Sequence, residues 1–198
     1  MFNSGITVKS IIEDIKGEVD IAIPVPDETY VGWLCSLEQL IYSEIIREQA
    51  FVSATSTRGV VELSKISVPE DTDKIRYEDI YAVYCEGLQL KQSTLASGRV
   101  FPKCYFKKEN NLALSDDVGS ELLIIYIARP KIKHAESMEN DYVMLPIEFL
   151  DLAKAKLRGE SYKLANEDIL AAKWLSDYNT LLETFKVWVS EKSPSFGI

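Results

Sequence analysis

The side chains that could carry out chemistry are few in this sequence and do not cluster along it. The chain has one histidine, His134, and three widely spaced cysteines, Cys35, Cys85 and Cys104. A histidine-based catalytic triad would need His134, but the surrounding KIKHAES is a polar loop sequence without a catalytic signature. Zinc would need four Cys, His or acidic ligands at recognisable spacings. We interpret His134 as a solvated loop residue and the cysteines as small buried hydrophobic residues, with no disulfide framework, metal or cofactor.

Paired carboxylates are the other candidates for chemistry, and they lie in expected loops. They are Glu70-Asp71 with Asp73, Asp116-Asp117, and Glu139 with Asp141. Solvated turns explain them better than general acid–base catalysis or calcium binding. The chain has neither GxGxxG nor GxxxxGK[ST], so no phosphate-binding loop is indicated. The sequence therefore predicts no catalytic residue and a protein that is not an enzyme. A small α+β enzyme that uses carboxylates or tyrosines stays open as an alternative, and a concave pocket with convergent polar groups would favour it.

Composition and charge describe a soluble globular chain of 198 residues, with a net charge of −9 and a pI near 4.8. An acidic chain lacks the excess of Lys and Arg that general binding to nucleic acid requires. No apolar run approaches the roughly 18 residues of a membrane span. The N-terminus also lacks the layout of a signal peptide. These features predict a protein that is made in the cytosol, does not enter a membrane and binds no nucleic acid specifically.

The longest element expected from the sequence is a C-terminal helix over 166–192. An apolar seam recurs along it at spacings of four and three, formed by Ala171, Leu175, Tyr178, Leu182, Phe185 and Val189. A flanking stripe consists of Leu170, Trp174, Leu181 and Trp188. A helix of this length needs a large partner surface. We predict that a helix from Asp27, as its N-cap, to about Gln49 covers the seam.

The rest of the chain predicts an α+β fold. A short helix capped by Thr7 precedes the helix over 27–49, and a further helical pattern follows Leu145. Between them, Gly and Pro punctuate short runs typical of strands, including 60–63, 65–68, 79–84, 88–90, 103–107, 112–114 and 121–129. Helices at both ends with strands between them favour α+β over alternating α/β. We predict a helical bundle from 1–50 and 142–192, an inserted antiparallel β block over 51–130, and a flexible tail over 193–198.

The tryptophans and the chain end indicate where the protein meets other molecules, because large rigid aromatic groups dominate interfaces. We predict an interface with neighbouring molecules formed by Trp188, Phe196, Ile198, Trp174 and Leu181. Trp188 is the leading candidate, because it lies beyond the reach of a short N-terminal bundle. Lys154, Lys156 and Arg158 form a small basic cluster. Favourable interaction with a helix C-terminus explains this cluster, and contact with an acidic partner is the alternative.

Four segments together resemble a known family. They read TVKSIIEDIKGE, PVPDETYVGWLCSLEQLIYSEII, LLIIYIARP and YVMLPIEFLDLAKAKLRGESYKLANEDILAAKWLSDYNTLLETF. Their order, over about Ile6 to Val189, resembles the head-to-tail adaptor, or connector, proteins of tailed bacteriophages. The resemblance implies a helix bundle with a β-rich insertion, assembled as a ring of usually twelve copies beneath the portal protein. It also implies that a tail or nozzle protein attaches below, and that genomic DNA passes through the lumen without specific binding.

The resemblance carries no catalytic residues over to this chain. It implies that the segment from Trp188 to Ile198 docks on the portal and that the protein lies at the head–tail junction of the virion after assembly in the bacterial cytoplasm. A head-closure or tail-completion protein, which contacts the tail and not the portal, is the closest alternative. The small α+β enzyme is the alternative from another class.

Overall fold

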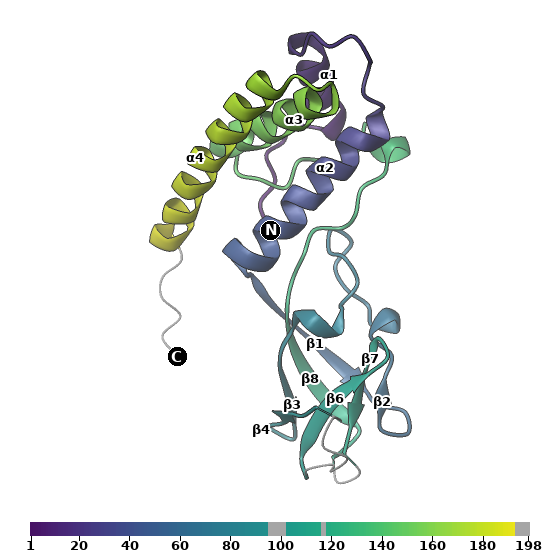
Figure 1. Ribbon diagram of the computed structural model, residues 1–198. Helices are drawn as coiled ribbons and strands as arrows, with labels where there is room; N and C mark the ends of the chain where they lie inside the picture. Colours follow the sequence, from purple (N-terminus) through teal and green to yellow (C-terminus); the bar gives the residue numbers. More distant parts are fainter. Residues whose placement is uncertain (95–101, 116–117, 193–198) are drawn as a thin grey trace. The chain divides into compact units, whose positions relative to one another are not determined.

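The computed structural model describes residues 1–94, 102–115 and 118–192, and it has the α+β fold class that the sequence predicts (Figure 1). The chain forms two compact units. Met1–Ile46 and the described residues from Ile132 onward make one, which we call the helical unit. Arg47–Lys131 makes the other, the β unit. The predicted tail over 193–198 lies outside the described residues.

The first helix, α1 (Val8–Glu18), begins where the sequence predicts. Thr7 is its N-cap, and its Oγ1 accepts a hydrogen bond from the backbone N–H of Ser10 at 3.2 Å. This bond satisfies one of the N–H groups that lack a partner at a helix start. The apolar stripe is buried on one side of the helix and consists of Val8, Ile11, Ile12 and Ile15.

The second helix, α2 (Asp27–Leu40), starts and ends differently from the prediction. Pro26 and not Asp27 occupies the N-cap position, because the extended backbone of Pro26 leaves Asp27 as the first helical residue. The α-helix then changes into a π-helix, η1 (Ile41–Ile46). Arg47 has a positive φ of 50°, which ends the helical path before Gln49. The predicted continuous helix to Gln49 is therefore wrong in its last turn.

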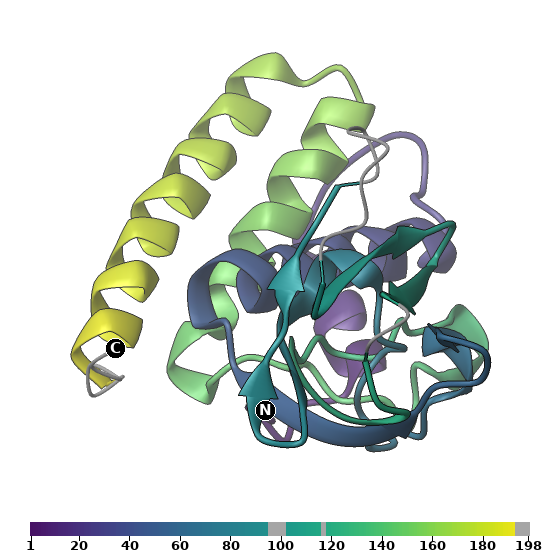
Figure 2. The same cartoon turned by 90° about the horizontal axis from the view of Figure 1, so that it is seen from below.

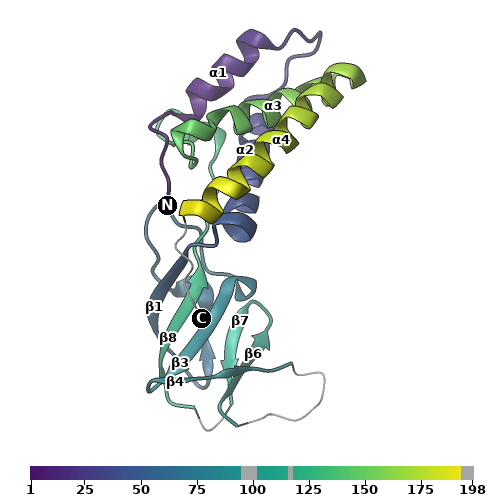
Figure 3. The ribbon, with the colours of Figure 1, turned by 90° about the vertical axis from the view of Figure 1, so that its left-hand side faces the viewer.

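The two C-terminal helices, α3 (Leu150–Leu164) and α4 (Asp168–Lys192), form an antiparallel hairpin (Figures 2 and 3). The main neighbour of α4 is α3, with a smaller contact to η1. Our prediction that the helix over 27–49 covers the seam of α4 therefore holds only in part, because α3 is the main cover and the predicted helix contributes through η1. A short connection makes consecutive helices neighbours, and that rule outweighs the match between two distant apolar faces. The seam itself is buried at Ala171, Tyr178, Phe185 and Val189.

A polar segment leads from the β unit back into the helices. It contains one short 3-10 turn, η5 (Ala135–Ser137), and a second, η6 (Ile147–Phe149), opens α3. Between them Val143 and Leu145 are fully buried in the same core as the helical stripes. Backbone bonds tie this segment to the N-terminus, as from Val143 N to the carbonyl of Ile6 at 2.9 Å. Both ends of the chain therefore contribute to one core.

The strands of the β unit form two sheets of four strands each. The first sheet has the order β1 (Gln49–Thr55), β8 (Glu121–Ile127), β3 (Ile80–Cys85) and β4 (Leu88–Gln89). The second has the order β2 (Val60–Val61), β7 (Asn111–Leu114), β6 (Cys104–Lys108) and β5 (Lys91–Gln92). All pairs are antiparallel except β5 with β6. Only Leu90 separates β4 from β5, so one short segment contributes to both sheets.

Tight turns explain the hairpins of the β unit. Both Glu86 and Gly87 have positive φ, 50° and 78°, between β3 and β4. Two consecutive residues with positive φ are the pattern of the type I′ turn, which matches the twist of paired strands. Arg58 and Gly59 repeat it after β1, with φ of 53° and 73°. The hairpin predicted around Glu109 is confirmed as β6–β7.

Three strand assignments in the β unit differ from the prediction. The sequence places a strand over 65–68, whereas the structure has a 3-10 turn, η2 (Leu63–Lys65), followed by irregular chain. The sequence also predicts no strand at β1 (Gln49–Thr55) or at β5 (Lys91–Gln92). A second 3-10 turn, η3 (Tyr77–Asp79), precedes β3.

The two units differ in net charge, because the β unit is neutral and the rest of the chain is acidic. The sequence range of the β unit holds 12 Lys and Arg against 12 Asp and Glu. The remainder of the chain holds 10 Lys and Arg against 19 Asp and Glu, so it accounts for the whole net charge of −9. Like-charge repulsion between copies of this protein therefore acts mainly through the helical unit.

Candidate interaction surface

The turn between α3 and α4 carries an exposed apolar surface, which we call the apolar tip. It consists of Leu164, Ile169 and Leu170, which are 57%, 87% and 40% exposed. Asn166 makes the turn possible with a φ of 60°, a conformation that asparagine tolerates better than most residues. None of these three residues belongs to the apolar seam of α4. The sequence analysis therefore singles out only Leu170, as part of the flanking stripe. Exposed aliphatic side chains that gather at one point typically mark an interaction site.

Trp174 lies one helical turn beyond Leu170 on α4 and is half-buried. The guanidinium of Arg158 on α3 stacks over its ring, with 4.5 Å from Cζ to the ring centroid. The ammonium of Lys173 lies 5.1 Å from the same centroid. These cations hold the indole in place through cation–π interactions while part of it stays accessible. Of the predicted interface residues, Trp174 is the one beside the apolar tip.

The structure contradicts our prediction that Trp188 lacks cover within the chain. The centroid of its ring lies 5.2 Å from the ring centroid of Phe149, 5.9 Å from that of Phe185 and 5.7 Å from that of Phe2. Phe149 comes from the start of α3 and Phe2 from the N-terminus, which the sequence alone does not bring to this point. Trp188 is therefore half-buried in an aromatic cluster of the helical unit.

The other predicted interface residues are divided between two outcomes. Leu181 is half-buried and packs against the core of the helical unit. Phe196 and Ile198 lie outside the described residues. The structure thus packs Trp188, Leu181 and Trp174 against the core, and of these three only Trp174 also lies beside the apolar tip.

The basic cluster predicted on α3 forms ion pairs within the chain. Lys154 Nζ lies 2.9 Å from Asp14 on α1, and Arg158 pairs with Glu18 on the same helix. Burial lowers the pKa of Arg158. Lys156 pairs with Glu160 at 2.7 Å along α3 itself. These contacts tie α1 to α3, so contact with an acidic partner is not needed to explain the cluster.

A buried polar cluster in the helical unit has no signal in the sequence. Glu38 on α2 is 1% exposed and forms an ion pair with Lys133, which is 6% exposed. Burial raises the pKa of Glu38, against the opposing effects of the Lys133 ammonium and of a hydrogen bond from the N–H of Met144 at 2.7 Å. Cys35, one turn before Glu38, accepts a hydrogen bond from the backbone N–H of Lys133 at 3.3 Å, and burial raises the pKa of its thiol. The cluster fixes the polar segment after the β unit to α2.

The reactive residues singled out in the sequence do not meet in the described structure. His134 is exposed, as predicted, and the three cysteines are buried and form no disulfide. Among the described residues, no group of three or more His, Cys, Asp or Glu side chains is arranged to hold a metal ion. The pair Asp116-Asp117 lies outside these residues.

Comparison with known proteins adds no family to this picture, since neither a known protein family nor a curated protein matches the sequence. Across the described part of the chain, each helix is too short or too polar to cross a lipid bilayer. The fold and surface define an α+β protein with a helical unit, an inserted β unit and an exposed apolar tip beside a tryptophan.

Proposed function

We propose that this protein is a structural component of a tailed-bacteriophage virion, a ring-forming head-to-tail adaptor that joins the portal protein to the tail. The observation that carries the proposal is the arrangement of the chain. Both ends build one helical unit, and a β unit is inserted between them. This is the architecture that the resemblance in the sequence implies for such adaptors.

The surface of the helical unit supports an assembly role. The apolar tip offers a compact hydrophobic contact, and Trp174 beside it is a large, held aromatic group of the kind enriched at interfaces. We therefore assign contacts with a neighbouring copy or with the portal to the tip and Trp174, in place of Trp188. Heterologous contacts of this kind close into rings when the rotation between neighbours allows it.

The charge distribution fits a channel through which DNA moves. The helical unit carries the whole net charge of −9, and negative charge on a channel wall reduces adhesion of the phosphate backbone. DNA would then pass through the lumen without specific binding. No residue of the chain is assigned a catalytic, metal-binding or cofactor-binding role in this proposal.

The test is assembly with the portal protein encoded in the same genome. Native mass spectrometry and electron microscopy of the mixed proteins should show a ring of this chain, of about twelve copies by the family resemblance, on the portal. Ile169→Glu should impair ring formation, because it places a charge at the centre of the apolar tip. Ile23→Glu, at a residue that is 74% exposed elsewhere in the helical unit, is the matched control and should assemble normally.

A protein that stays monomeric with the portal at high concentration would contradict the proposal. Crosslinking in assembled particles separates the closest alternative. Crosslinks to a tail protein and none to the portal would identify a head-closure or tail-completion protein. The remaining alternative, a small α+β enzyme, would require a catalysed reaction, and the proposal assigns no reaction to this protein.

A further inference from the structure

β1 is the one long strand at an edge of the described sheets. It ends the first sheet and pairs only with β8, over seven residues in an unbroken register from Gln49 to Thr55. The strands at the other ends of the two sheets, β4, β2 and β5, have two residues each. Short edge strands offer little to a pairing chain, whereas a long one is a ready template.

The outward backbone groups of β1 can be assigned from the ladder. Ala128 N–H donates to the carbonyl of Glu48, and Ser56 N–H donates to that of Ser120, both at 2.8 Å. Because bonded pairs alternate in an antiparallel ladder, the even-numbered residues of β1 bond to β8. The N–H and C=O groups of the odd-numbered residues, which include Phe51 and Ser53, face away from β8.

β1 has none of the features that protect edge strands. Its sequence, QAFVSAT, contains no charged residue and no proline, and its pairing with β8 has no bulge. Phe51 is 78% exposed, although it lies in the middle of a regular strand. Natural proteins block exposed edges with charges, prolines or bulges when pairing is to be avoided. An unprotected edge with an exposed aromatic residue therefore indicates a pairing surface.

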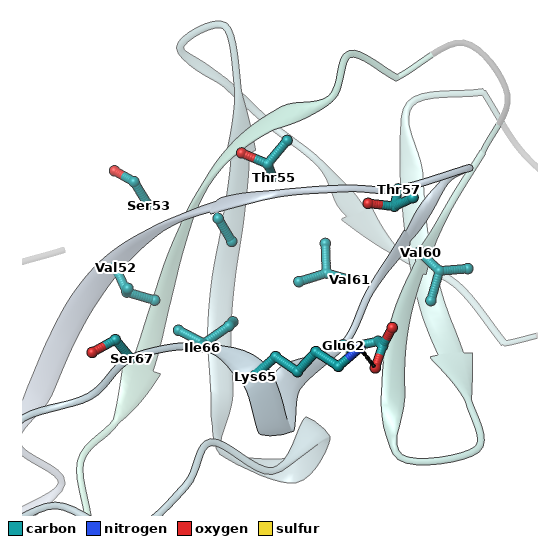
Figure 4. Close-up of a pocket in the computed structure, with 11 residues that line it drawn as sticks. Val52, Ser53, Thr55, Thr57, Val60, Val61, Glu62, Lys65, Ile66 and Ser67 are labelled. Atoms are coloured by element: carbon teal, nitrogen blue, oxygen red, sulfur yellow. Dashed lines mark ion pairs between the residues drawn. The ribbon is translucent and has the colours of Figure 1, made fainter.

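An open groove runs along this edge. It has a volume of about 460 Å³ and lies between β1 and the chain from Thr57 to Ser67. Val52, Val61 and Ile66 lie around its interior in Figure 4. The only charged side chains that line it, Glu62 and Lys65, pair with each other at 2.8 Å. Beside β1, this groove therefore presents no unpaired charge that would repel an uncharged strand approaching the edge.

The charge distribution favours a second copy of this chain as the source of that strand. A two-fold contact brings identical surfaces together, so any net charge on them repels. The β unit has equal numbers of acidic and basic residues, and β1 itself has none. β1 can therefore approach its own copy without the repulsion that the helical unit would produce.

The sequence of β1 fits antiparallel pairing with itself. All seven residues overlap only when Val52 faces Val52 of the second copy, because Val52 is the middle residue. In this register Phe51 lies opposite the small Ser53, and the two Phe51 rings are diagonal neighbours within reach of each other. The outward groups of the odd-numbered residues then form the hydrogen bonds.

We propose that two copies of this protein associate by antiparallel pairing of their β1 strands, centred on Val52, to form one continuous sheet across a two-fold axis. The contact is separate from the proposed function, because a two-fold pair cannot by itself close a ring of many subunits. One strand pair buries less than the roughly 1,200–2,000 Å² of stable complexes. The dimer should therefore be weak and depend on concentration.

The first experiment measures the self-association of the full chain by sedimentation equilibrium over a wide concentration range. The unmodified protein should show a monomer–dimer equilibrium. Phe51→Lys should raise the dimer Kd by about tenfold or more, because two diagonal lysines would repel and the aromatic contact would be lost. Tyr81→Lys is the matched control, since Tyr81 is an exposed aromatic residue on the interior strand β3, and should leave Kd unchanged.

The second experiment tests the register by cysteine crosslinking. The Cα atoms of a non-hydrogen-bonded antiparallel pair lie about 4.5 Å apart, within the range of a disulfide. Val52→Cys should therefore form a disulfide-linked dimer under mild oxidation. Ala54→Cys should not, because it would face Ala50 of the second copy. The three native cysteines are buried.

Three results would overturn the proposal. The first is a monomer at every concentration together with no crosslink at Val52→Cys. The second is equal weakening by Phe51→Lys and Tyr81→Lys, which would place the contact on the sheet face. The third is a crosslink at Ala54→Cys but not at Val52→Cys, which would exclude the centred register. A test of ring assembly on the portal is independent of all three, so failure of either proposal can be recognised separately.

Discussion

The helical unit and the β unit are stabilised in different ways, and each therefore has a different weak point. In the helical unit, side chains from distant segments meet in one core, as Phe2, Phe149 and Trp188 do. In the β unit, backbone ladders and turns with positive φ determine the path, as at Glu86 and Gly87. Of the six non-glycine residues with positive φ in the described chain, only Asn166 belongs to the helical unit. Substitutions should therefore act through packing in one unit and through the backbone in the other.

In the described part of each unit, one ion pair is largely shielded from solvent. Glu38 and Lys133 pair in the helical unit, and Asp79 and Arg129 pair in the β unit at 2.6 Å. Both acids receive a further backbone hydrogen bond, Glu38 from Met144 and Asp79 from Arg76 at 3.1 Å. Burial raises the pKa of Asp79 as it does that of Glu38. The units thus share this feature, although they differ in net charge.

The largest effect is expected for Glu38→Gln. The substitution leaves the Lys133 ammonium buried beside a neutral amide, which typically costs about 3–5 kcal/mol. The loss should fall on the helical unit and leave the exchange protection of β8 unchanged. Hydrogen exchange followed by mass spectrometry measures both units in one sample.

The control for this prediction is the double substitution Glu38→Gln with Lys133→Met. It removes the buried charge, and the glutamine carbonyl can still accept the hydrogen bond from Met144 N–H. Part of the lost stability should return. If the double variant is no more stable than Glu38→Gln, desolvation of the ammonium is not the cause.

The second prediction separates the two tryptophans of α4. Trp188→Ala should lower the free energy of unfolding by about 2–3 kcal/mol, somewhat less than for a fully buried tryptophan, because it opens the aromatic cluster. Trp174→Ala should cost about 1 kcal/mol or less, since it mainly loses the cation–π contacts with Arg158 and Lys173. Chemical denaturation of the isolated protein measures both values.

The order of these two effects decides which residue belongs to the core. Equal losses, or a larger loss for Trp174→Ala, would show that the cover of Trp188 contributes little. Assembly with the portal should show the opposite order. Under conditions in which both variants are folded, Trp174→Ala should impair assembly more than Trp188→Ala does. This ordering reverses the one that the sequence alone predicts.

The sequence predicts local structure well where a short pattern determines it. The stripe of α1, the turn at Glu109 and the apolar run of β8 were all visible in single segments. The fold class followed from their order along the chain. By contrast, the cover of Trp188 depends on Phe2 and Phe149, which lie 186 and 39 residues away in sequence. Sequence periodicity shows that a face needs a partner but does not identify the partner.

Three further features could not be predicted from the sequence, each for a different reason. Glu38 lies in a helical pattern where a glutamate normally faces solvent, and only the structure shows Lys133 beside it. The apolar tip arises because Ile169 and Leu164 lie off the seam of α4, next to a turn. No strand is predicted at β1 (Gln49–Thr55), where the positive φ of Arg47 separates the strand from the helical pattern before it.

The third prediction concerns alkaline pH and the β unit. Burial raises the pKa of Tyr105 on β6 to about 12, whereas an unfolded tyrosine has a pKa of about 10. The neutral phenol therefore contributes stability that is fully present below pH 10 and is lost as the pH rises from 10 to 12. The loss should reach about 2–3 kcal/mol in the β unit.

Tyr105→Phe is the control for the alkaline effect, because it keeps the ring and removes the ionisable group. The variant should show a flatter dependence of β-unit stability on pH between 10 and 12, measured by urea denaturation at each pH. Tyr77, whose ring lies 6.2 Å away, also has a raised pKa and should leave a smaller residual slope. An unchanged slope in Tyr105→Phe would assign the effect to other groups.

The smallest effects expected are those of three glycines, and they test the comparison between the units most directly. At Gly159 on α3, an added Cβ would lie 2.7 Å from Cδ2 of Leu175 and 3.3 Å from its backbone N. Leu175 must therefore shift, and Gly159→Ala should lower the free energy of unfolding by about 1–2 kcal/mol despite the better helix propensity of alanine. Gly32→Ala on α2, where nothing lies within 4 Å, should instead raise it by about 0.5–1 kcal/mol.

At Gly87 in the β unit, substitution by alanine should also be destabilising, but through backbone conformation and not through crowding. An added Cβ there meets nothing within 4 Å, but φ is +78°. Gly87→Ala should therefore cost about 1 kcal/mol through backbone strain alone. Gly87→Asn provides the test, because asparagine tolerates positive φ and should recover part of the loss, whereas Gly159→Asn should be worse than Gly159→Ala. If asparagine helps at both positions or at neither, as measured by thermal unfolding, packing and backbone conformation do not divide between the units in this way.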